Sequence, residues 1–174
     1  SEASEAAILE AHGTGTALGD PIEVGAVEAV FLAHRAGVDE PLRIGSLKAN
    51  AGHTEPGAGI AGMLKLLMQL MGASMPPNAQ LRLLNPHVGT CMASLAGALP
   101  TQLAPTSSKC FSGVSSFGFS GTIAHGAFTT VLSTTSGSFG GKSGASLYPA
   151  KSARGVQAYM RAYTHATHTR MHDN

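Results

Sequence analysis

Two histidines and one lysine are the residues of this chain whose types and positions could do chemistry. His12 follows an apolar stretch at residues 6–10 that predicts a short buried strand, and Lys48 and His53 follow a second at residues 42–47. Open α/β sheets place their ligand sites beyond the carboxyl ends of strands, so all three side chains would meet at one edge. Imidazole, with a pKa of about 6.5, can donate hydrogen bonds or protons at neutral pH. The spacing indicates a candidate active site.

Each histidine also has a purely structural interpretation. Glycines surround both histidines, in the sequences HGTG at residues 12–15 and AGH at residues 51–53. Such loops let backbone groups approach an imidazole closely and satisfy its two nitrogens. A loop histidine held in this way is common, and spacing alone does not choose between this interpretation and an active site.

A strong helix start lies between the two predicted strands, at residues 20–23 (DPIE). We expect Asp20 to be the N-cap, the proline to take the first helical position and Glu23 to complete a capping box. Apolar residues follow at helical spacing through residues 22–33, and Gly37 is a natural end for this helix.

A second helix is predicted from the Thr-Glu-Pro at residues 54–56 to about Met71. Glycines inside a helix destabilise it by about 1 kcal/mol each relative to alanine, so Gly57, Gly59 and Gly62 predict close packing against a neighbouring backbone. Further strands are predicted at residues 97–100, 111–117 and 122–132, the last two as a hairpin around residues 118–121. The order β-α-β-α-β-β predicts a layered αβα half-domain of the α/β class.

The composition excludes several classes of protein. The chain has 174 residues, of which 43% are hydrophobic and 12% charged, which excludes a wholly disordered chain. A net charge of +1 argues against a nucleic-acid-binding protein. Lys65 interrupts the longest low-charge stretch, so we expect no membrane span. Two cysteines cannot form a disulfide framework, and the opening residues SEASE carry no secretory signal, so we expect a cytoplasmic location.

Charge and composition change near residue 132. Residues 1–132 carry six basic and nine acidic residues, net −3, whereas residues 133–174 carry five basic residues and one Asp, net +4. The second part opens with STTSGS, which buries too little apolar surface to offset its ordering entropy. We therefore expect residues 1–132 to fold and residues 133–174 to form a disordered Ser/Gly/His-rich linker or flexible tail, with a short helix around residues 156–163.

Three motifs resemble a known family. Residues 10–23 (EAHGTGTALGDPIE) closely resemble the EAHGTGTxxGDPxE motif of β-ketoacyl synthase domains in type I polyketide and fatty acid synthases. Residues 45–54 (GSLKANAGHT) match the family's GSxKxNxGHT element, and residues 115–125 (SSFGFSGTIAH) match its SSFGxSGTNAH hairpin. Three long motifs in the family's order are far more specific than one short pattern. The resemblance implies the C-terminal half of a ketosynthase, with the thiolase-like fold.

The resemblance also implies a reaction. In the family, a cysteine takes an acyl chain from an acyl carrier protein, a malonyl-type extender loses CO2, and its carbanion attacks the acyl thioester. His12 and His53 match the histidines that stabilise the developing enolate oxygen, and Lys48 matches the lysine that organises the second histidine. Thr14 and Thr16 match hydroxyls that bind the phosphopantetheine arm of the carrier protein.

The hairpin motif adds one further site residue. Phe119 matches the gating phenylalanine, whose backbone N–H completes the oxyanion hole for the acyl thioester, whereas we expect Phe117 to pack in the core. The resemblance implies no metal and no bound cofactor, because the substrates are carried on phosphopantetheine.

Three features depart from the family pattern. The nucleophilic cysteine of the family lies upstream, in a segment that this chain lacks, and we expect Ser1 to be an internal point of a longer polypeptide. Cys91 follows both histidine motifs in a predicted loop, so we do not expect it to be the nucleophile, nor Cys110. Ile123 replaces the usual asparagine, and the resemblance ends after Leu132.

We therefore expect an acyltransferase, the C-terminal half of a β-ketoacyl synthase, that is inactive as an isolated chain. Its expected partners are an acyl carrier protein, the N-terminal ketosynthase half and a second copy in a homodimer. One alternative is a non-catalytic half-domain that completes a separate N-terminal half. Another is a fragment that aggregates through its exposed apolar surface and sheet edges. The sequence does not distinguish polyketide from fatty acid synthesis, nor does it fix chain length or extender.

Overall fold

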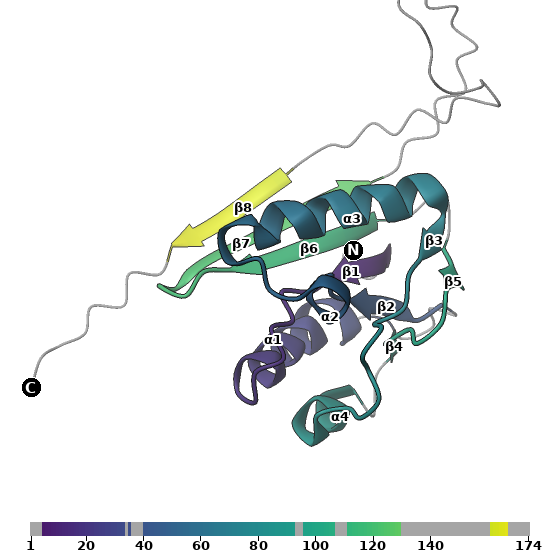
Figure 1. The fold of residues 1–174 in the computed structure, drawn as a ribbon, viewed down its shortest axis with the longest axis horizontal. Coiled ribbons are helices and arrows are strands. Elements are labelled where there is room, and N and C mark those ends of the chain that lie inside the picture. Colours follow the sequence, from purple (N-terminus) through teal and green to yellow (C-terminus); the bar gives the residue numbers. More distant parts are fainter. Residues whose placement is uncertain are drawn as a thin grey trace, which may run out of the picture.

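The computed structural model describes residues 5–33, 35, 40–92, 96–106, 111–129 and 161–166. A six-stranded mixed sheet is the centre of the fold (Figure 1). Its strands, in spatial order, are β4 (Gly97–Ala98), β2 (Leu42–Gly45), β1 (Ala6–Glu10), β6 (Phe111–Phe117), β7 (Thr122–Thr129) and β8 (Arg161–Ala166).

The strand β1 lies between two parallel neighbours, β2 and β6. Glu10, its last residue, is level with Gly45 of β2 and with Val114 of β6. Because the three strands run in the same direction, the loops that follow β1 and β2 leave the sheet side by side. The hydrogen bond from the Ala11 N–H to the Gly45 carbonyl, 2.7 Å long, continues the pairing into those loops.

Helices cover both faces of the sheet. One face packs against α1 (Gly19–Val27) and its π-helical continuation η2 (Glu28–Leu32), and the other against α3 (Ala58–Gly72), which runs along β6 in Figure 1. The first core contains Ala6, Leu9, Val27, Phe31, Leu32, Leu42 and Ile44. The second contains Ile8, Leu66, Leu70, Met75, Val114 and Phe128. The expected αβα layering is thereby confirmed.

A register shift in β1 decides which way its last residues point. The pairing of β1 with β6 is irregular between Ala6 and Ile8, so the usual alternation of side chains is interrupted there. Beyond the irregularity, Leu9 packs in the α1 core and Ile8 in the α3 core. Glu10, two residues after Ile8, therefore points to the α3 side of the sheet.

Two of the three expected glycine contacts in the second helix are confirmed. A Cβ at Gly59 would lie 2.7 Å from the Ser116 Oγ of β6, and one at Gly62 would lie 3.3 Å from the Glu10 Cγ. Because Gly59 and Gly62 have no side chains, the backbone of α3 packs closely against the sheet. Gly57 has no such role, because its nearest neighbour is the Thr54 Oγ1 of the same turn at 3.7 Å.

The capping box expected at the start of α1 is wrong. The helix begins at Gly19 with Leu18 as N-cap, and the Leu18 side chain makes no capping hydrogen bond. Asp20 and Glu23 instead accept hydrogen bonds from backbone N–H groups of the loop that precedes the helix. The helix also ends earlier than Gly37, since η2 closes at Leu32, and residues 36–39 lie outside the described residues.

Shorter elements connect the layers. After β2 come α2 (Lys48–Ala51) and the 3₁₀ turn η3 (Glu55–Gly57), which leads directly into α3. A two-stranded antiparallel sheet joins β3 (Ser74–Met75) to β5 (Ala104–Pro105). The loop expected around Cys91 is in fact helical, because α4 spans Pro86–Met92.

The expected hairpin of β6 and β7 is confirmed, with Phe117 opposite Ile123, and the described part of β7 ends at Thr129. The strand β8 pairs antiparallel with β7, from Thr122 opposite Ala166 to Ala127 opposite Arg161. The helix expected over residues 156–163 is therefore wrong for its last three residues, and its first five lie outside the described residues. The division of the chain at residue 132 stays a prediction. In the part of the chain that the structure describes, no helix combines the length and the apolarity that crossing a membrane requires.

Candidate active site

Glu23 holds the loop that carries His12. Its buried carboxylate accepts two backbone hydrogen bonds, from the N–H of His12 at 2.7 Å and from that of Gly13 at 2.8 Å. Gly13 has a φ of +44° and lies so close to Ser46 that a Cβ would come within 2.8 Å of the serine Cβ. Only glycine fits both constraints, so this position fixes the close approach of the first loop to the second.

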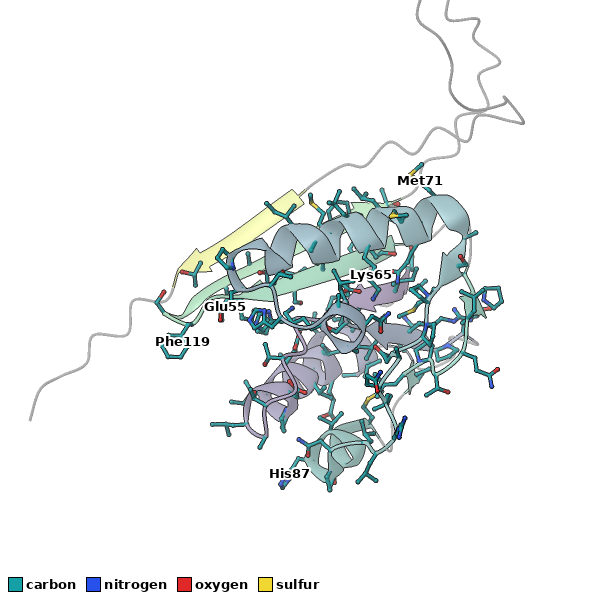
Figure 2. All side chains as sticks on the ribbon, viewed as in Figure 1. Glu55, Lys65, Met71, His87 and Phe119 are labelled. Atoms are coloured by element: carbon teal, nitrogen blue, oxygen red, sulfur yellow. The ribbon has the colours of Figure 1, made fainter. Side chains whose placement is uncertain are left out.

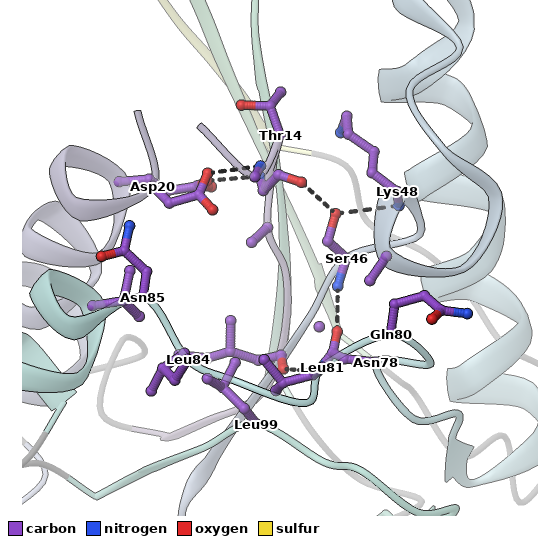
Figure 3. A pocket seen from close by; sticks show the side chains of 18 of the residues that line it. Thr14, Asp20, Ser46, Lys48, Asn78, Gln80, Leu81, Leu84, Asn85 and Leu99 are labelled. Atoms are coloured by element: carbon purple, nitrogen blue, oxygen red, sulfur yellow. Dashed lines mark hydrogen bonds between the residues drawn. The ribbon is translucent and has the colours of Figure 1, made fainter. Parts of the chain in front are cut away.

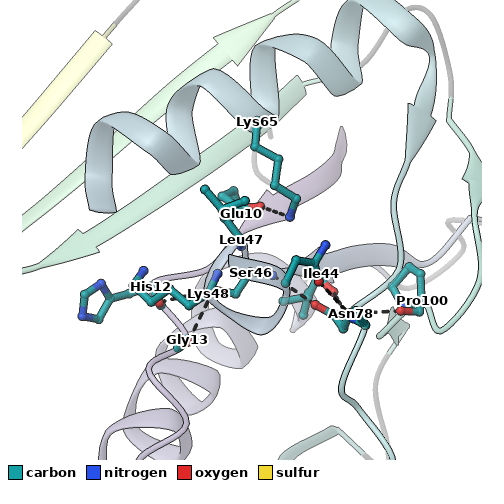
Figure 4. Close-up of polar contacts among 12 residues, drawn as sticks. Glu10, His12, Gly13, Ile44, Ser46, Leu47, Lys48, Lys65, Asn78 and Pro100 are labelled. Atoms are coloured by element: carbon teal, nitrogen blue, oxygen red, sulfur yellow. Dashed lines mark hydrogen bonds and ion pairs between the residues drawn. The ribbon is translucent and has the colours of Figure 1, made fainter. Parts of the chain in front are cut away.

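The second loop is anchored beneath Lys48. The Leu47 N–H donates to the Glu10 carboxylate, and the Ser46 N–H donates to the buried Asn78 Oδ1 at 3.1 Å. Asn78 also donates from its Nδ2 to the Ile44 carbonyl at 3.2 Å, which ties it to β2 (Figure 4). The backbone around Lys48 is therefore held from below at two successive residues.

The two loops bring the rings of His12 and His53 into edge contact. The ring centroids lie 5.6 Å apart with an interplanar angle of 88°. The His12 ring also packs against that of Phe117, with centroids 5.2 Å apart. Residues 41 positions apart in the sequence thus form one side-chain pair at the carboxyl ends of β1 and β2.

Backbone hydrogen bonds select the tautomer of both histidines. The Phe117 N–H donates to the His12 Nδ1 at 3.3 Å, and the Glu55 N–H donates to the His53 Nδ1 at 3.1 Å. A ring nitrogen that accepts a hydrogen bond carries no proton, so each neutral imidazole carries its proton on Nε2. Both side chains therefore present an Nε2–H donor.

The surroundings of His12 keep its imidazole neutral. Burial lowers the pKa of His12 to about 4, and the positive charges of Lys48 and, when protonated, His53 act in the same direction. At neutral pH, His12 is therefore a hydrogen-bond donor through Nε2 rather than a cation.

Lys48 contributes a cation whose charge interacts with two buried carboxylates. Burial lowers the pKa of Lys48, while the negative charges of Glu10 and Glu23 act in the opposite direction. Burial likewise raises the pKa of both glutamates, and their hydrogen bonds and the nearby lysines oppose that rise. The acidic residues thus have two roles, since they fix the two loops and balance the charge of the lysine.

A cavity of about 470 Å³ opens beside these groups (Figure 3). Thr14, Lys48 and His53 line it together with apolar side chains, and in Figure 3 Thr14 and Lys48 lie across the pocket from Leu81, Leu84 and Leu99. The apolar side chains include Leu81, Leu83, Leu84, Val88 and Leu99. The cavity is large enough for an extended small-molecule arm with a polar end near the lysine.

The two threonines of the first loop differ in position. Thr14 lines the cavity, whereas the exposed Thr16 accepts the Gly19 N–H at 3.1 Å and so closes the start of α1. Their hydroxyl oxygens lie 3.4 Å apart. Only the Thr14 side chain therefore faces the space beside Lys48 and His53.

Phe119 lies apart from these groups in this structure. It is fully exposed at the tip of the β6–β7 hairpin (Figure 2), and Ile123 is half-exposed on β7. The structure thus brings His12, Lys48, His53 and Thr14 together, and leaves Thr16 and Phe119 at the periphery. Among the described residues, no three His, Cys, Asp or Glu side chains are placed to hold a metal ion.

Sequence reasoning missed four residues that build the site: Glu10, Glu23, Lys65 and Asn78. Two of them carried a signal. Glu10 is an acid at the end of an apolar strand, and Lys65 is a lone charge in an apolar helix, so each could be expected to have a buried partner.

Comparisons with known proteins agree with this architecture. Residues 2–82 match the model of the β-ketoacyl synthase C-terminal domain. A phenolphthiocerol/phthiocerol polyketide synthase from Mycobacterium tuberculosis is 46% identical over 123 residues, covering 70% of this chain and 6% of that protein. Erythronolide synthase EryA2 of Saccharopolyspora erythraea is 40% identical over 126 residues, covering 71% of this chain and 3% of that protein.

Solved structures extend the agreement to the fold. A ketosynthase from the bacillaene polyketide synthase of Bacillus amyloliquefaciens is 32% identical with a TM-score of 0.66, covering 74% of this chain and 23% of that chain. An oxazolomycin ketosynthase domain of Streptomyces albus is 31% identical with a TM-score of 0.68, covering 76% and 24%. The chain thus spans about a quarter of these ketosynthases and a few per cent of its curated relatives.

The layered sheet and its solved neighbours define a thiolase-like α/β half-domain. The chain belongs to the β-ketoacyl synthase family and is the C-terminal half of a ketosynthase domain homologous to those of polyketide synthases.

Proposed function

We propose that this chain supplies the decarboxylating half of an acyltransferase that forms carbon–carbon bonds on carrier-bound substrates. The observation that carries the proposal is the pair formed by His12 and His53, in which a backbone N–H occupies the Nδ1 of each ring and leaves Nε2–H as its donor. Two adjacent donors of this kind suit an oxygen on which negative charge develops.

The proposed reaction begins with a malonyl-type thioester. Its carboxylate leaves as CO2, and the electron pair of the broken C–C bond moves into the thioester to form an enolate. The Nε2–H groups of His12 and His53 donate to the enolate oxygen. The enolate carbon then attacks an acyl thioester on a cysteine of the N-terminal ketosynthase half, and the cysteine leaves as a thiolate. Each donor of this type contributes roughly 3–4 kcal/mol to lowering such a barrier.

Lys48 and the threonines of the first loop have separate proposed roles, Lys48 beside the reacting group and the threonines along the phosphopantetheine arm. The Lys48 ammonium, whose charge interacts with Glu10 and Glu23, adds positive charge near the histidine pair without protonating His12. We propose that the phosphopantetheine arm of an acyl carrier protein enters along the cavity, with Thr14 as its contact and Thr16 nearer the entrance. Phe119 would meet the acyl thioester only once the N-terminal half covers the hairpin tip.

The exposed face of α3 supports the N-terminal half as a partner. Ile60, Leu64, Met68 and Met71 recur at helical spacing on the side away from the sheet and are 64%, 54%, 73% and 69% exposed. A contiguous apolar stripe of this kind marks an interaction surface. We propose that the N-terminal half covers it, that the isolated chain is inactive, and that the assembled domain is a homodimer. The histidine pair does not favour the alternative of a non-catalytic half-domain.

The test is an assembled ketosynthase in which this chain follows the N-terminal segment of the 46% identical mycobacterial relative. We expect His12→Ala and His53→Ala each to lower malonyl decarboxylation by roughly 10²–10³-fold while cysteine acylation continues. His87→Ala, an exposed histidine on α4, is the matched control. Decarboxylation by the His12 and His53 variants at the control rate would refute the proposed roles, and turnover by the isolated chain would refute its inactivity.

A further inference from the structure

The side chain of Glu10 joins three elements of the fold. It is 2% exposed at the end of β1, and its Oε1 accepts the Leu47 N–H at 2.5 Å. Its Oε2 accepts from the Lys65 Nζ of α3, also at 2.5 Å (Figure 4). Both oxygens of a buried carboxylate are thus occupied, one by the loop that carries Lys48 and the other by a helix.

The position of Leu47 makes this contact relevant to the reaction. Leu47 is the N-cap of α2, and the next residue is Lys48, the first of that helix. A hydrogen bond to the Leu47 N–H therefore fixes the backbone from which the lysine side chain departs. With the Ser46–Asn78 contact one residue earlier, the carboxylate sets the direction of that backbone.

Lys65 ties the carboxylate to the helix that follows the His53 loop in the chain. It lies on α3, whose preceding turn contains Glu55, the residue whose N–H holds the His53 Nδ1. Gly62, one turn before Lys65, leaves room for the Glu10 side chain, because a Cβ there would come within 3.3 Å of the Glu10 Cγ. The glycine therefore leaves space on α3 for the Glu10 side chain. The Lys65 side chain that binds it is also buried, with 9% of its surface exposed.

We propose that Glu10 and Lys65 are positioning residues for decarboxylation: Glu10 holds the Lys48 backbone through the Leu47 N–H, and Lys65 holds Glu10. The inference rests on the proposed function, in which Lys48 and His53 act on the extender. Neither Glu10 nor Lys65 touches the substrate; they fix where the groups that do touch it are placed.

A matched pair of double variants isolates the positioning role. Glu10→Gln/Lys65→Met and Glu10→Leu/Lys65→Met both remove the buried ion pair, and they differ in whether an oxygen remains for the Leu47 N–H. In the assembled ketosynthase, we expect the leucine variant to decarboxylate roughly tenfold to a hundredfold more slowly than the glutamine variant. Cysteine acylation, measured in the same samples, should be equal in both.

Amide hydrogen exchange on the full chain gives a second readout that does not depend on activity. We expect the Leu47 amide to exchange at least about tenfold faster in the leucine variant than in the glutamine variant, while amides of β6 exchange equally. Equal decarboxylation and equal Leu47 exchange in the two variants would overturn the proposal. The exchange of the Leu47 amide is compared between the two variants and needs no enzyme activity. A failure of this inference can therefore be distinguished from a failure of the proposed function.

The unsubstituted chain tests the contact itself if the leucine variant does not fold. On acidification, the Leu47 amide proton shift should follow the protonation of the Glu10 carboxyl in NMR spectra. If the Leu47 amide proton shift did not change as the Glu10 carboxyl is protonated, the proposal would be overturned.

Discussion

The Nδ1 atom of His12 accepts a hydrogen bond from the backbone N–H of Phe117, 105 residues later in the chain. This contact joins the first loop to the last strand of the parallel part of the sheet. It also decides which nitrogen of the neutral His12 ring carries the proton, since Nδ1 accepts and Nε2 is left as the donor. A backbone group on a rigid strand is a fixed donor, so the direction of the imidazole does not depend on a mobile side chain.

The stability of the chain should fall as the pH drops from about 6.5 to about 4 partly because of His12. Its pKa is about 4 in the folded chain and about 6.5 when unfolded, so the unfolded state binds more protons in this window. The stabilisation is complete above the unfolded pKa and decreases as the pH falls. Urea unfolding at several pH values should show a shallower decrease for His12→Gln than for the unsubstituted chain, and identical slopes would contradict the pKa.

Removing the Glu23 carboxylate should loosen the first loop. Glu23→Ala leaves the N–H groups of His12 and Gly13 without an acceptor, and each unpaired buried group destabilises by about 1–3 kcal/mol. Thermal unfolding and exchange of the two amides would measure the effect. Glu28→Gln, in the following η2 turn, is the control and should change the free energy of unfolding little. Unchanged exchange of the His12 amide in Glu23→Ala would count against this anchor.

Two glycine-to-alanine changes in helices should have opposite signs. Gly25→Ala on α1 meets nothing within 4 Å and should stabilise the chain by about 0.5–1 kcal/mol through helix propensity. Gly59→Ala on α3 meets the Ser116 Oγ at 2.7 Å and should destabilise by about 1–3 kcal/mol despite the same gain.

Ser116→Gly should reverse the Gly59→Ala loss, because it removes the atoms that the new methyl group meets. Denaturant unfolding of the single and double variants would test this coupling. Additive effects of the two substitutions would show that the close packing of α3 on β6 is not the cause.

Charges on the outer face of α3 should prevent assembly with the N-terminal half. Leu64→Glu/Met68→Glu places two carboxylates in the apolar stripe without altering the face that packs on the sheet. We expect at least tenfold weaker capture of the N-terminal segment, on the scale of about 1.4 kcal/mol for each factor of ten.

Leu103→Glu, a 70% exposed leucine away from α3, is the matched control and should assemble normally. Size-exclusion chromatography of the two halves mixed together would measure the complex. Equal assembly of the α3 variant and this control would place the interface elsewhere.

Local patterns were sufficient for the strands and helices that carry the site and for part of the site itself. The predicted starts of β1, β6 and the second hairpin strand agree with the structure. Strands and turns can be predicted from short segments because their apolar and turn-forming residues are close together in the sequence. His12, Lys48 and His53 were found because strand ends bring their following loops together. The start of α1 was predicted wrongly because a capping pattern does not reveal a nearby loop with unpaired N–H groups. Asp20 and Glu23 bond that loop instead.

The sequence by itself determined the order of the main strands and helices around the site, the family motifs and the loops that carry the reactive groups, all of which depend on short-range chemistry. Only the tertiary structure decided the proton positions on the histidines, the use of Glu23 as a loop anchor and the pairing of Glu10 with Lys65. Glu10 and Lys65 lie 55 residues apart, and their contact depends on a register shift in β1 and on a glycine in α3. Such contacts follow from how the layers pack, which no single segment specifies.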